Sequence, residues 1–189
     1  TITFDSLRPP CPHMDETHEA WLRSVRGFID KEIMPFVEDW EEAGRIPREL
    51  FKAASDAGLL GVGYPAEYGG EGTDFDRFHG IVTSEELARI GAGGVSSALM
   101  IHGIGLPPIM AMGSETMKQE IGRAVLSGEK QLSLGITEPG GGSDVAQLKT
   151  KAVKDGNGWR GNGSKTYITG GMTSKWATTA VRTGGDGMG

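Results

Sequence analysis

The chain has 189 residues, of which 25 are acidic and 19 are basic, so its formal net charge at pH 7 is −6. This balance argues against a nucleic-acid surface, which would need a clustered basic patch. No apolar run approaches the roughly 18 residues of a membrane span, and the first residues lack the pattern of a signal peptide, so a soluble protein is expected. The single cysteine, Cys11, excludes an internal disulfide and is typical of a reducing compartment.

Helix-forming residues dominate up to about Lys130, where glycine, threonine and strand patterns take over. Residues 1–12 contain three prolines and no periodicity, which predicts an extended arm. Cys11 and His13 are potential metal ligands, but two such residues near a terminus do not make a metal site, and no metal is expected. From Asp15 onward, apolar residues recur at helical spacing, and Pro35 is expected to kink or divide this helix.

Two further helices are expected before residue 91. One begins at Pro47 and closes at Gly58, and the next is capped by Thr73 or Asp74 and runs to about residue 90. Glu85 falls within the apolar stripe of the latter, with Arg89 as its i+4 neighbour. A catalytic carboxylate and a structural ion pair are both compatible with this position, and the ion pair is favoured.

A helix of small and apolar residues is expected over 95–104, buried on most sides because it carries almost no charge. Such a helix can line an apolar tunnel, or it can simply pack in a core. His102, near its end, is the only histidine expected inside the core, and without a nucleophile motif beside it we interpret it as a packed side chain. Ser114 is expected to cap the last helix of this part.

Residues 132–136 alternate between apolar and polar or small side chains, which predicts a short strand. The strand leads into Pro139 and the glycines 140–142, whose backbone can turn several N–H groups toward one point. Such a concavity binds anions, and Ser143 adds a hydroxyl donor at its rim. Taken alone, the same run is also typical of a tight solvated loop.

A second strand ending in threonine and glycine is expected at 165–169, and the two strand ends are expected to pair and to present Thr137 and Thr169 side by side. Between them, residues 155–158 predict a hairpin turn, and 175–182 predict a last strand. A sheet that ends on a loop lacks partner strands, so we expect this chain to be a piece of a longer polypeptide.

Two segments together carry a resemblance: Leu134-Gly-Ile-Thr-Glu-Pro-Gly-Gly-Gly-Ser-Asp144 and Asn162-Gly-Ser-Lys-Thr-Tyr-Ile-Thr-Gly170. In sequence and spacing they resemble the acyl-CoA dehydrogenase family, where these segments clasp the isoalloxazine and pyrophosphate of FAD. The resemblance extends over nearly the whole chain. It implies an α+β fold, with an N-terminal all-α helical domain over residues 1–129 followed by an incomplete β-barrel or β-sandwich domain over 130–189.

The resemblance also implies an activity. A carboxylate base removes the α proton of an acyl-CoA thioester while the β hydrogen passes as hydride to flavin N5. Backbone amides of Ile136 and Thr137 are suited to the N1 and C2=O edge, where negative charge develops. Thr169 would hold the N5 side, and Tyr167 would lie against the ring system where the family usually has tryptophan. The implied cofactor-binding residues are Leu134, Ile136, Thr137, Gly142, Ser143, Tyr167, Ile168 and Thr169, and Ser143 is also implied to bind the substrate.

In the family the base is a glutamate on a C-terminal helical domain, so no catalytic residue is expected in this chain, and Glu85, Glu138 and Asp144 are not assigned that role. This fragment alone is expected to bind FAD weakly and to be inactive. An electron-transfer flavoprotein or similar acceptor, a homo-oligomer when full length, and a bacterial cytoplasmic or mitochondrial matrix location are implied. Two alternatives stay open: an acyl-CoA oxidase or related flavin oxidase or monooxygenase of the same fold, and a non-catalytic binding module.

Overall fold

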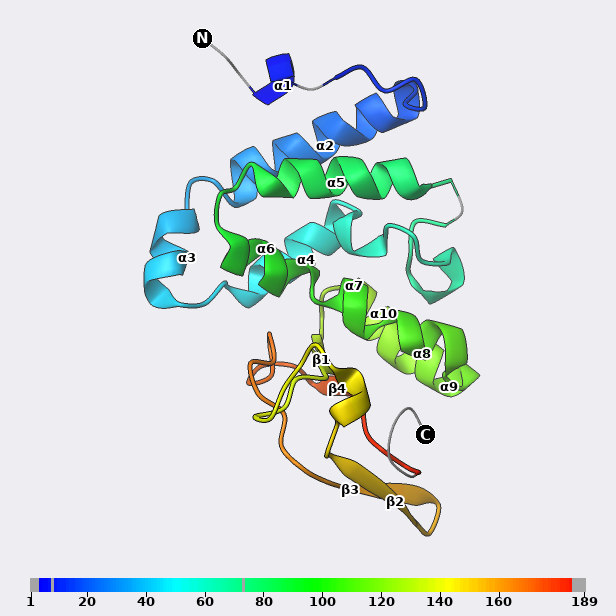
Figure 1. Cartoon of the computed structure of the whole chain (residues 1–189). Helices are drawn as coiled ribbons and strands as arrows, with labels where there is room; N and C mark the ends of the chain where they lie inside the picture. Colours follow the sequence, from blue (N-terminus) through cyan, green and yellow to red (C-terminus); the bar gives the residue numbers. More distant parts are fainter. Residues whose placement is uncertain (1–3, 8, 73, 185–189) are drawn as a thin grey trace.

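The computed structural model describes residues 4–7, 9–72 and 74–184, in which a series of helices is followed by two small sheets (Figure 1). This confirms the expected α+β class, and the sheets do not close into a barrel. The helices are α1 (Phe4–Leu7), α2 (Glu16–Glu32), α3 (Val37–Ala43), α4 (Arg48–Asp56), α5 (Arg77–Ala88), α6 (Gly93–Met100), α7 (His102–Gly105), α8 (Pro107–Met112), α9 (Glu115–Met117) and α10 (Arg123–Leu126). The strands are β1 (Leu132–Gly135), β2 (Lys151–Asp155), β3 (Gly158–Asn162) and β4 (Trp176–Thr179).

Several helix ends lie where local sequence signals place them. Pro35 separates α2 from α3, and Gly44, in the left-handed region at φ 65°, closes α3. Gly58 adopts φ 79° just after α4. The Ser114 hydroxyl accepts the N–H of Met117 and caps α9, as expected. The arm predicted for residues 1–12 differs in part, because Phe4–Leu7 forms the short helix α1.

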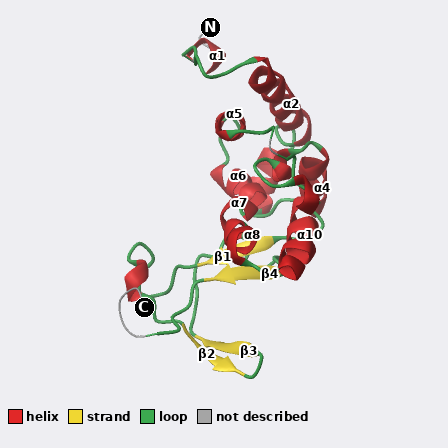
Figure 2. Ribbon diagram, turned by 90° about the vertical axis from the view of Figure 1, so that its right-hand side faces the viewer, coloured by secondary structure: helices red, strands yellow, loops and turns green. Residues whose placement is uncertain are grey.

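The helices enclose two apolar clusters. The larger cluster joins α2, α4, α5 and α6 and includes Val25, Ile29 and Leu99, none of which is exposed. The smaller cluster contains Leu106 and Leu126 from the later helices together with Leu132 of β1. The first strand is therefore fixed by the helices that precede it, on the side where Figure 2 shows the helices stacked above β1 and β4.

The contact between α2 and α5 is partly polar, and this corrects the expected stripe of α5. The helix begins at Arg77 with Asp76 as its cap, not with Thr73, which lies outside the described residues, or Asp74. Its buried face carries Glu86, whereas the apolar Ile81 is half exposed. Apolar periodicity predicts the wrong face of α5, because the face that is buried includes the polar residues His79, Thr83 and Glu86.

Glu86 is 1% exposed and bridges the two helices. Arg26 of α2 donates to both of its carboxylate oxygens, at 2.9 and 2.7 Å, and Arg89 donates at 2.9 Å. An ion pair that bridges α5 to another helix is therefore present, and the acid that pairs with Arg89 in it is Glu86, three residues before Arg89. Burial opposes ionisation of Glu86, but the hydrogen bonds from both arginines outweigh it and hold the pKa below its ordinary value.

The strands form two pairs. β1 and β4 are parallel, with Leu132 opposite Trp176 and Gly135 opposite Thr179, while β2 and β3 form the expected antiparallel hairpin. The last strand is shorter than the predicted range of 175–182. The strand predicted over 165–169 is absent from this described segment, because Tyr167 has φ 56° and interrupts the extended backbone.

Among the described residues, no single helix has the length and apolar character needed to cross a membrane. One bent pair, Gly93–Met100 with His102–Met112 at 46°, meets these requirements by length and composition when its two members are taken together.

Replacing Glu86 with glutamine should destabilise the protein. The change leaves the Arg26 guanidinium facing a neutral amide at the buried position of Glu86. Breaking a buried ion pair in this way typically costs about 3 kcal/mol. Urea denaturation of the purified protein at pH 7 measures the loss. The exposed Glu42→Gln on α3 is the control and should change the free energy of unfolding by no more than about 0.5 kcal/mol. Equal stability of both variants would contradict this role of Glu86.

Candidate functional site

β1 is held against the short helix α7 by a contact that excludes a side chain. A Cβ atom on Gly105 would lie 3.1 Å from the carbonyl oxygen of Ser133, so the two backbones meet directly. The Thr178 hydroxyl of β4 donates to the Gly105 carbonyl at 2.7 Å. Because both strands rest on α7, the loop that follows β1 begins at the edge of the helical part.

That loop, residues 136–143, closes on itself. Glu138 and Gly141 exchange both backbone hydrogen bonds, at 2.9 and 3.1 Å, around Pro139 and Gly140. The N–H group of Gly141, one of those expected to face an anion, is therefore used within the turn. A Cβ on Gly142 would lie 3.0 Å from Thr137 Cγ2, so the chain returns directly over the Thr137 side chain.

Ile136 and Thr137 have their carbonyl groups occupied. The Lys165 ammonium donates to the Ile136 carbonyl at 2.9 Å, and the Thr166 N–H donates to the Thr137 carbonyl at 2.9 Å. Neither residue's own N–H has a hydrogen bond within the described part of the chain. These two amides are thus among the donors that the loop leaves for another molecule.

Glu138 points into the protein and not toward a ligand. Its carboxylate accepts the N–H groups of Lys149 and Thr150, at 2.7 and 2.9 Å, and the Lys165 ammonium at 2.9 Å. The hydrogen bonds from Thr150, Lys165 and Lys149 hold the pKa of Glu138 well below its usual range. Lys165 is a residue that the sequence analysis assigned only to a strand, yet it joins the two motif segments. The presence of an acid in one motif and a lysine in the other was the sequence signal that could have predicted this ion pair.

The second segment lies along β1 without forming a strand. Thr166 meets Thr137 at one end, and a Cβ on Gly170 would lie 3.4 Å from the Ser133 hydroxyl at the other. Thr137 is therefore hydrogen-bonded to Thr166 and not to Thr169. Among the described non-glycine residues, only Tyr167 has positive φ, and its side chain is 92% exposed.

The predicted site residues consequently gather at one end of β1. Leu134 lies in β1 and is half-buried. Ser143 and Tyr167 are exposed and accessible to a ligand. The partly buried members of the set are Leu134, Ile136, Thr137, Gly142, Ile168 and Thr169.

A large cavity of about 1190 Å³ lies among α5, α6, α7, α8 and the segment 59–65. Ser96, Ser97 and Met100 of the helix expected to line a tunnel do contribute to its wall. Helix α5 also contributes to the wall, with Gly80 and Ala88, and nothing in the sequence pattern of this helix predicted it. None of the described lining residues is Asp, Glu, Lys or Arg, which suits an apolar occupant.

The two titratable residues of the cavity wall are neutral at pH 7. Burial lowers the pKa of His102 to about 4, and its Nε2 lies 3.1 Å from the Leu60 carbonyl, so the ring donates a hydrogen bond as neutral imidazole. Burial raises the pKa of Tyr64 to about 12. His102 is packed as expected, but His18 and His79 are also buried, which corrects the expectation that it is the only core histidine.

Comparison with known proteins gives a consistent result over this length. The family model described as the N-terminal domain of acyl-CoA dehydrogenase matches residues 15–129, and the model of the middle domain matches residues 133–189. An acyl-CoA dehydrogenase of Emericella nidulans, apdG, is 34% identical over 95% of this chain and 45% of its own length. The chain thus spans less than half the length of this curated relative.

Solved structures agree with this match. A probable acyl-CoA dehydrogenase from Mycobacterium abscessus superposes with a TM-score of 0.87 at 43% identity, over 92% of this chain and 46% of that one. A glutaryl-CoA dehydrogenase from Mycobacterium smegmatis, solved in complex with FADH2, has a TM-score of 0.83 at 32% identity, over 90% and 43% of the two chains. From both family models and these similarities it follows that the chain belongs to the acyl-CoA dehydrogenase family.

Proposed function

We propose that this chain contributes the flavin-binding loops and acyl-chain cavity of an FAD-dependent acyl-CoA dehydrogenase, which oxidises the α,β bond of an acyl-CoA thioester. The observation that carries the proposal is that the two motif segments meet at the end of β1, through Thr166 and Thr137, on helices that also wall an uncharged cavity. In this proposal the chain consists of a helical domain over residues 1–129 and the start of a β domain over residues 130–189. The change in composition and the two family matches support this division.

The residues at this end of β1 fit a flavin. Ile136 and Thr137 supply two backbone N–H groups that have no hydrogen bond within the described residues, which suits an edge that gains negative charge. Tyr167 projects a flat, almost fully exposed ring from a backbone conformation that costs a non-glycine residue about 1–2 kcal/mol. Such local strain is commonly found at functional sites. Ser143 is exposed at the rim and suited to phosphate oxygens of the cofactor or of the acyl-CoA.

When bound, FAD would supply the hydride acceptor at N5, and the chain's own residues would orient the reactants. The amides of Ile136 and Thr137 would be held in advance by the hydrogen bonds of their carbonyl groups to Lys165 and Thr166. Donors fixed before reaction need no reorganisation as charge develops. Thr169 and Ile168 would complete the opposite side of the ring, and Leu134 its packing edge.

The cavity would receive the acyl chain. Its wall combines small residues, such as Gly80, Ala88 and Gly103, with neutral His102 and Tyr64, so an alkyl chain meets no charge. Burial of such a chain is favourable by about 0.8 kcal/mol for each methylene group. The electron acceptor proposed for the full-length protein is an electron-transfer flavoprotein or a similar carrier, and the proposed location is the bacterial cytoplasm or the mitochondrial matrix.

No base is assigned to the buried acids of this chain. Glu138 is occupied by Lys165 and two backbone N–H groups, and Glu86 is occupied by Arg26 and Arg89. A carboxylate with a depressed pKa and all of these partners is a poor proton acceptor.

An absorbance titration tests the proposed function. The full-length protein, loaded with FAD, should lose the visible absorbance of the oxidised flavin when acyl-CoAs of increasing chain length are added without oxygen. Purified protein that binds no FAD, or that binds FAD without bleaching by any acyl-CoA, would overturn it. Rapid reoxidation of the reduced flavin by oxygen would instead support an oxidase.

Gly142→Ala should weaken FAD binding. The added Cβ would lie 3.0 Å from Thr137 Cγ2 and displace the residue whose amide is assigned to the flavin. Overpacking of this kind costs about 1–3 kcal/mol, so we expect a loss of about tenfold in affinity, measured by flavin fluorescence quenching. Gly140→Ala is the matched control, because its Cβ would be 3.9 Å from the Lys149 ammonium and should leave affinity nearly unchanged. Unaltered binding by Gly142→Ala would refute this placement.

Glu138→Gln should lower the Tm by several degrees at pH 7. It should not abolish flavin reduction, because Glu138 is not proposed to be the catalytic base. Because the folded pKa of Glu138 is depressed, its contribution is present above the unfolded value, about 4.3, and is lost as the pH falls below it. The Tm difference from the parent protein should therefore shrink toward pH 3. Asp144→Asn, an exposed acid of the same loop, is the control. Abolished flavin reduction in a folded, FAD-loaded Glu138→Gln protein would show that Glu138 acts in catalysis.

A further inference from the structure

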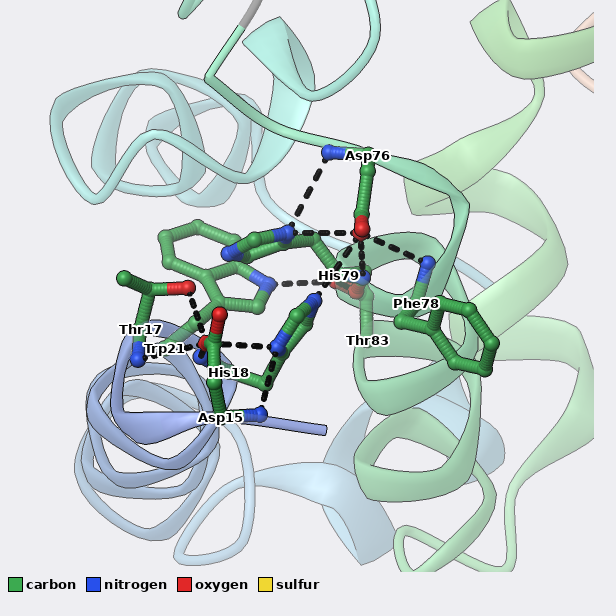
Figure 3. Close-up of polar contacts among 8 residues, drawn as sticks. All are labelled: Asp15, Thr17, His18, Trp21, Asp76, Phe78, His79 and Thr83. Atoms are coloured by element: carbon green, nitrogen blue, oxygen red, sulfur yellow. Dashed lines mark hydrogen bonds and ion pairs between the residues drawn. The ribbon is translucent and has the colours of Figure 1, made fainter. Parts of the chain in front are cut away.

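The N-termini of α2 and α5 lie side by side and share one pattern, aspartate followed three residues later by histidine (Figure 3). Asp15 caps α2 and Asp76 caps α5, and each carboxylate accepts N–H groups of its own first turn. In return, the Nδ1 atoms of His18 and His79 lie 3.0 and 3.2 Å from the backbone N–H groups of Asp15 and Asp76. Ordinary helix capping explains each half of this arrangement separately.

Capping does not account for the contacts between the two halves. Asp76 Oδ1 lies 3.0 Å from His18 Nε2 of the other helix and 3.0 Å from His79 Nδ1 of its own. The two imidazole rings have centroids 4.2 Å apart and are buried, whereas the Asp76 side chain is 53% exposed. Two nitrogen atoms and one carboxylate oxygen therefore converge, all within 4.8 Å of one another, with one side open to solvent.

We propose that His18, Asp76 and His79 form a binding site for a divalent metal ion of the zinc class. Two imidazole nitrogens and one carboxylate oxygen are a ligand set suited to Zn²⁺ or Co²⁺, which take four ligands at about 2.0–2.2 Å. The ligands would be His18 Nε2, His79 Nδ1 and Asp76 Oδ1, and the metal would replace the hydrogen bond that His79 Nδ1 accepts from the Asp76 backbone N–H. A water molecule entering from the exposed Asp76 side would complete a tetrahedron.

The second carboxylate gives His18 an orienting partner. When Nε2 of His18 binds the metal, the ring proton moves to Nδ1. The hydrogen bond that Nδ1 accepts from the Asp15 backbone N–H is then lost, and Nδ1–H donates instead to Asp15 Oδ1, 2.8 Å away. That geometry is the carboxylate–histidine–metal arrangement, which fixes the tautomer and the direction of a ligand. Asp15 is thus a positioning residue for the site and not a ligand.

The charges around the proposed metal site have opposing effects on the binding of a cation. Two helix N-termini point their positive ends at the cluster and oppose a cation. The negative charges of the Asp15 and Asp76 carboxylates offset this repulsion. Mg²⁺, which prefers oxygen ligands, is not expected to bind.

Cobalt absorbance tests the site in the full-length, untagged protein after chelator treatment. Titration with Co²⁺ should produce visible bands that saturate at one ion per chain and disappear on addition of Zn²⁺, while Mg²⁺ has no effect. His18→Gln and His79→Gln should each abolish the bands, and Asp15→Asn should weaken binding about 10- to 100-fold. Far-UV circular dichroism and flavin content verify that each variant is folded.

His13→Gln is the matched control. His13 is exposed, and its ring lies 5.6 Å from that of Phe78 at the start of α5, so it is near the cluster but outside the ligand set. Its replacement should leave the cobalt spectrum unchanged. Absence of bands in the parent protein, or bands that survive in folded His18→Gln and His79→Gln but vanish in His13→Gln, would overturn the assignment.

Discussion

The direct contact between α7 and β1 fixes the position of everything that follows in the chain. Gly105 meets the backbone of Ser133 without an intervening side chain, and Leu132 completes the apolar cluster of the later helices. Thr178 attaches the partner strand to the same helix. Since the loop after β1 starts from this fixed strand, it opens next to the helices that wall the cavity. A larger residue at 105 would separate the two parts of the proposed site.

Buried charge, and not only apolar packing, determines how the elements are aligned. A purely apolar contact between α2 and α5 would tolerate sliding, because dispersion and burial have little directional preference. The two hydrogen bonds from Arg26 to Glu86 admit one register, and Trp21 adds a hydrogen bond to the Thr83 hydroxyl at 2.8 Å. Glu138 has the same effect in the β part, where it aligns Lys165 with the loop after β1.

Sequence patterns predict a structural feature correctly where its physical cause lies within a few residues of it. Pro35, Gly44 and Ser114 act through their own backbone or side chain within one turn, so helix boundaries near them could be predicted, as could the hairpin at 155–158. The buried face of α5 could not be predicted in the same way. Glu86 is buried only because Arg26 lies 60 residues earlier, and no periodicity within α5 contains that information.

The placement of Tyr167 shows the same limit at the candidate site. The β-forming residues at 165–169 predict a strand, but two hydrogen bonds, from Thr166 to Thr137 and from Gly171 to Ile168, both at 2.9 Å, fix the backbone differently. The residue between them takes φ 56°. Glycine would adopt this conformation without the steric cost, so the tyrosine must contribute through its side chain. An exposed ring with no packing role in the chain's own core is suited to stack on a second flat ring, which is the position that the proposed function gives to the flavin.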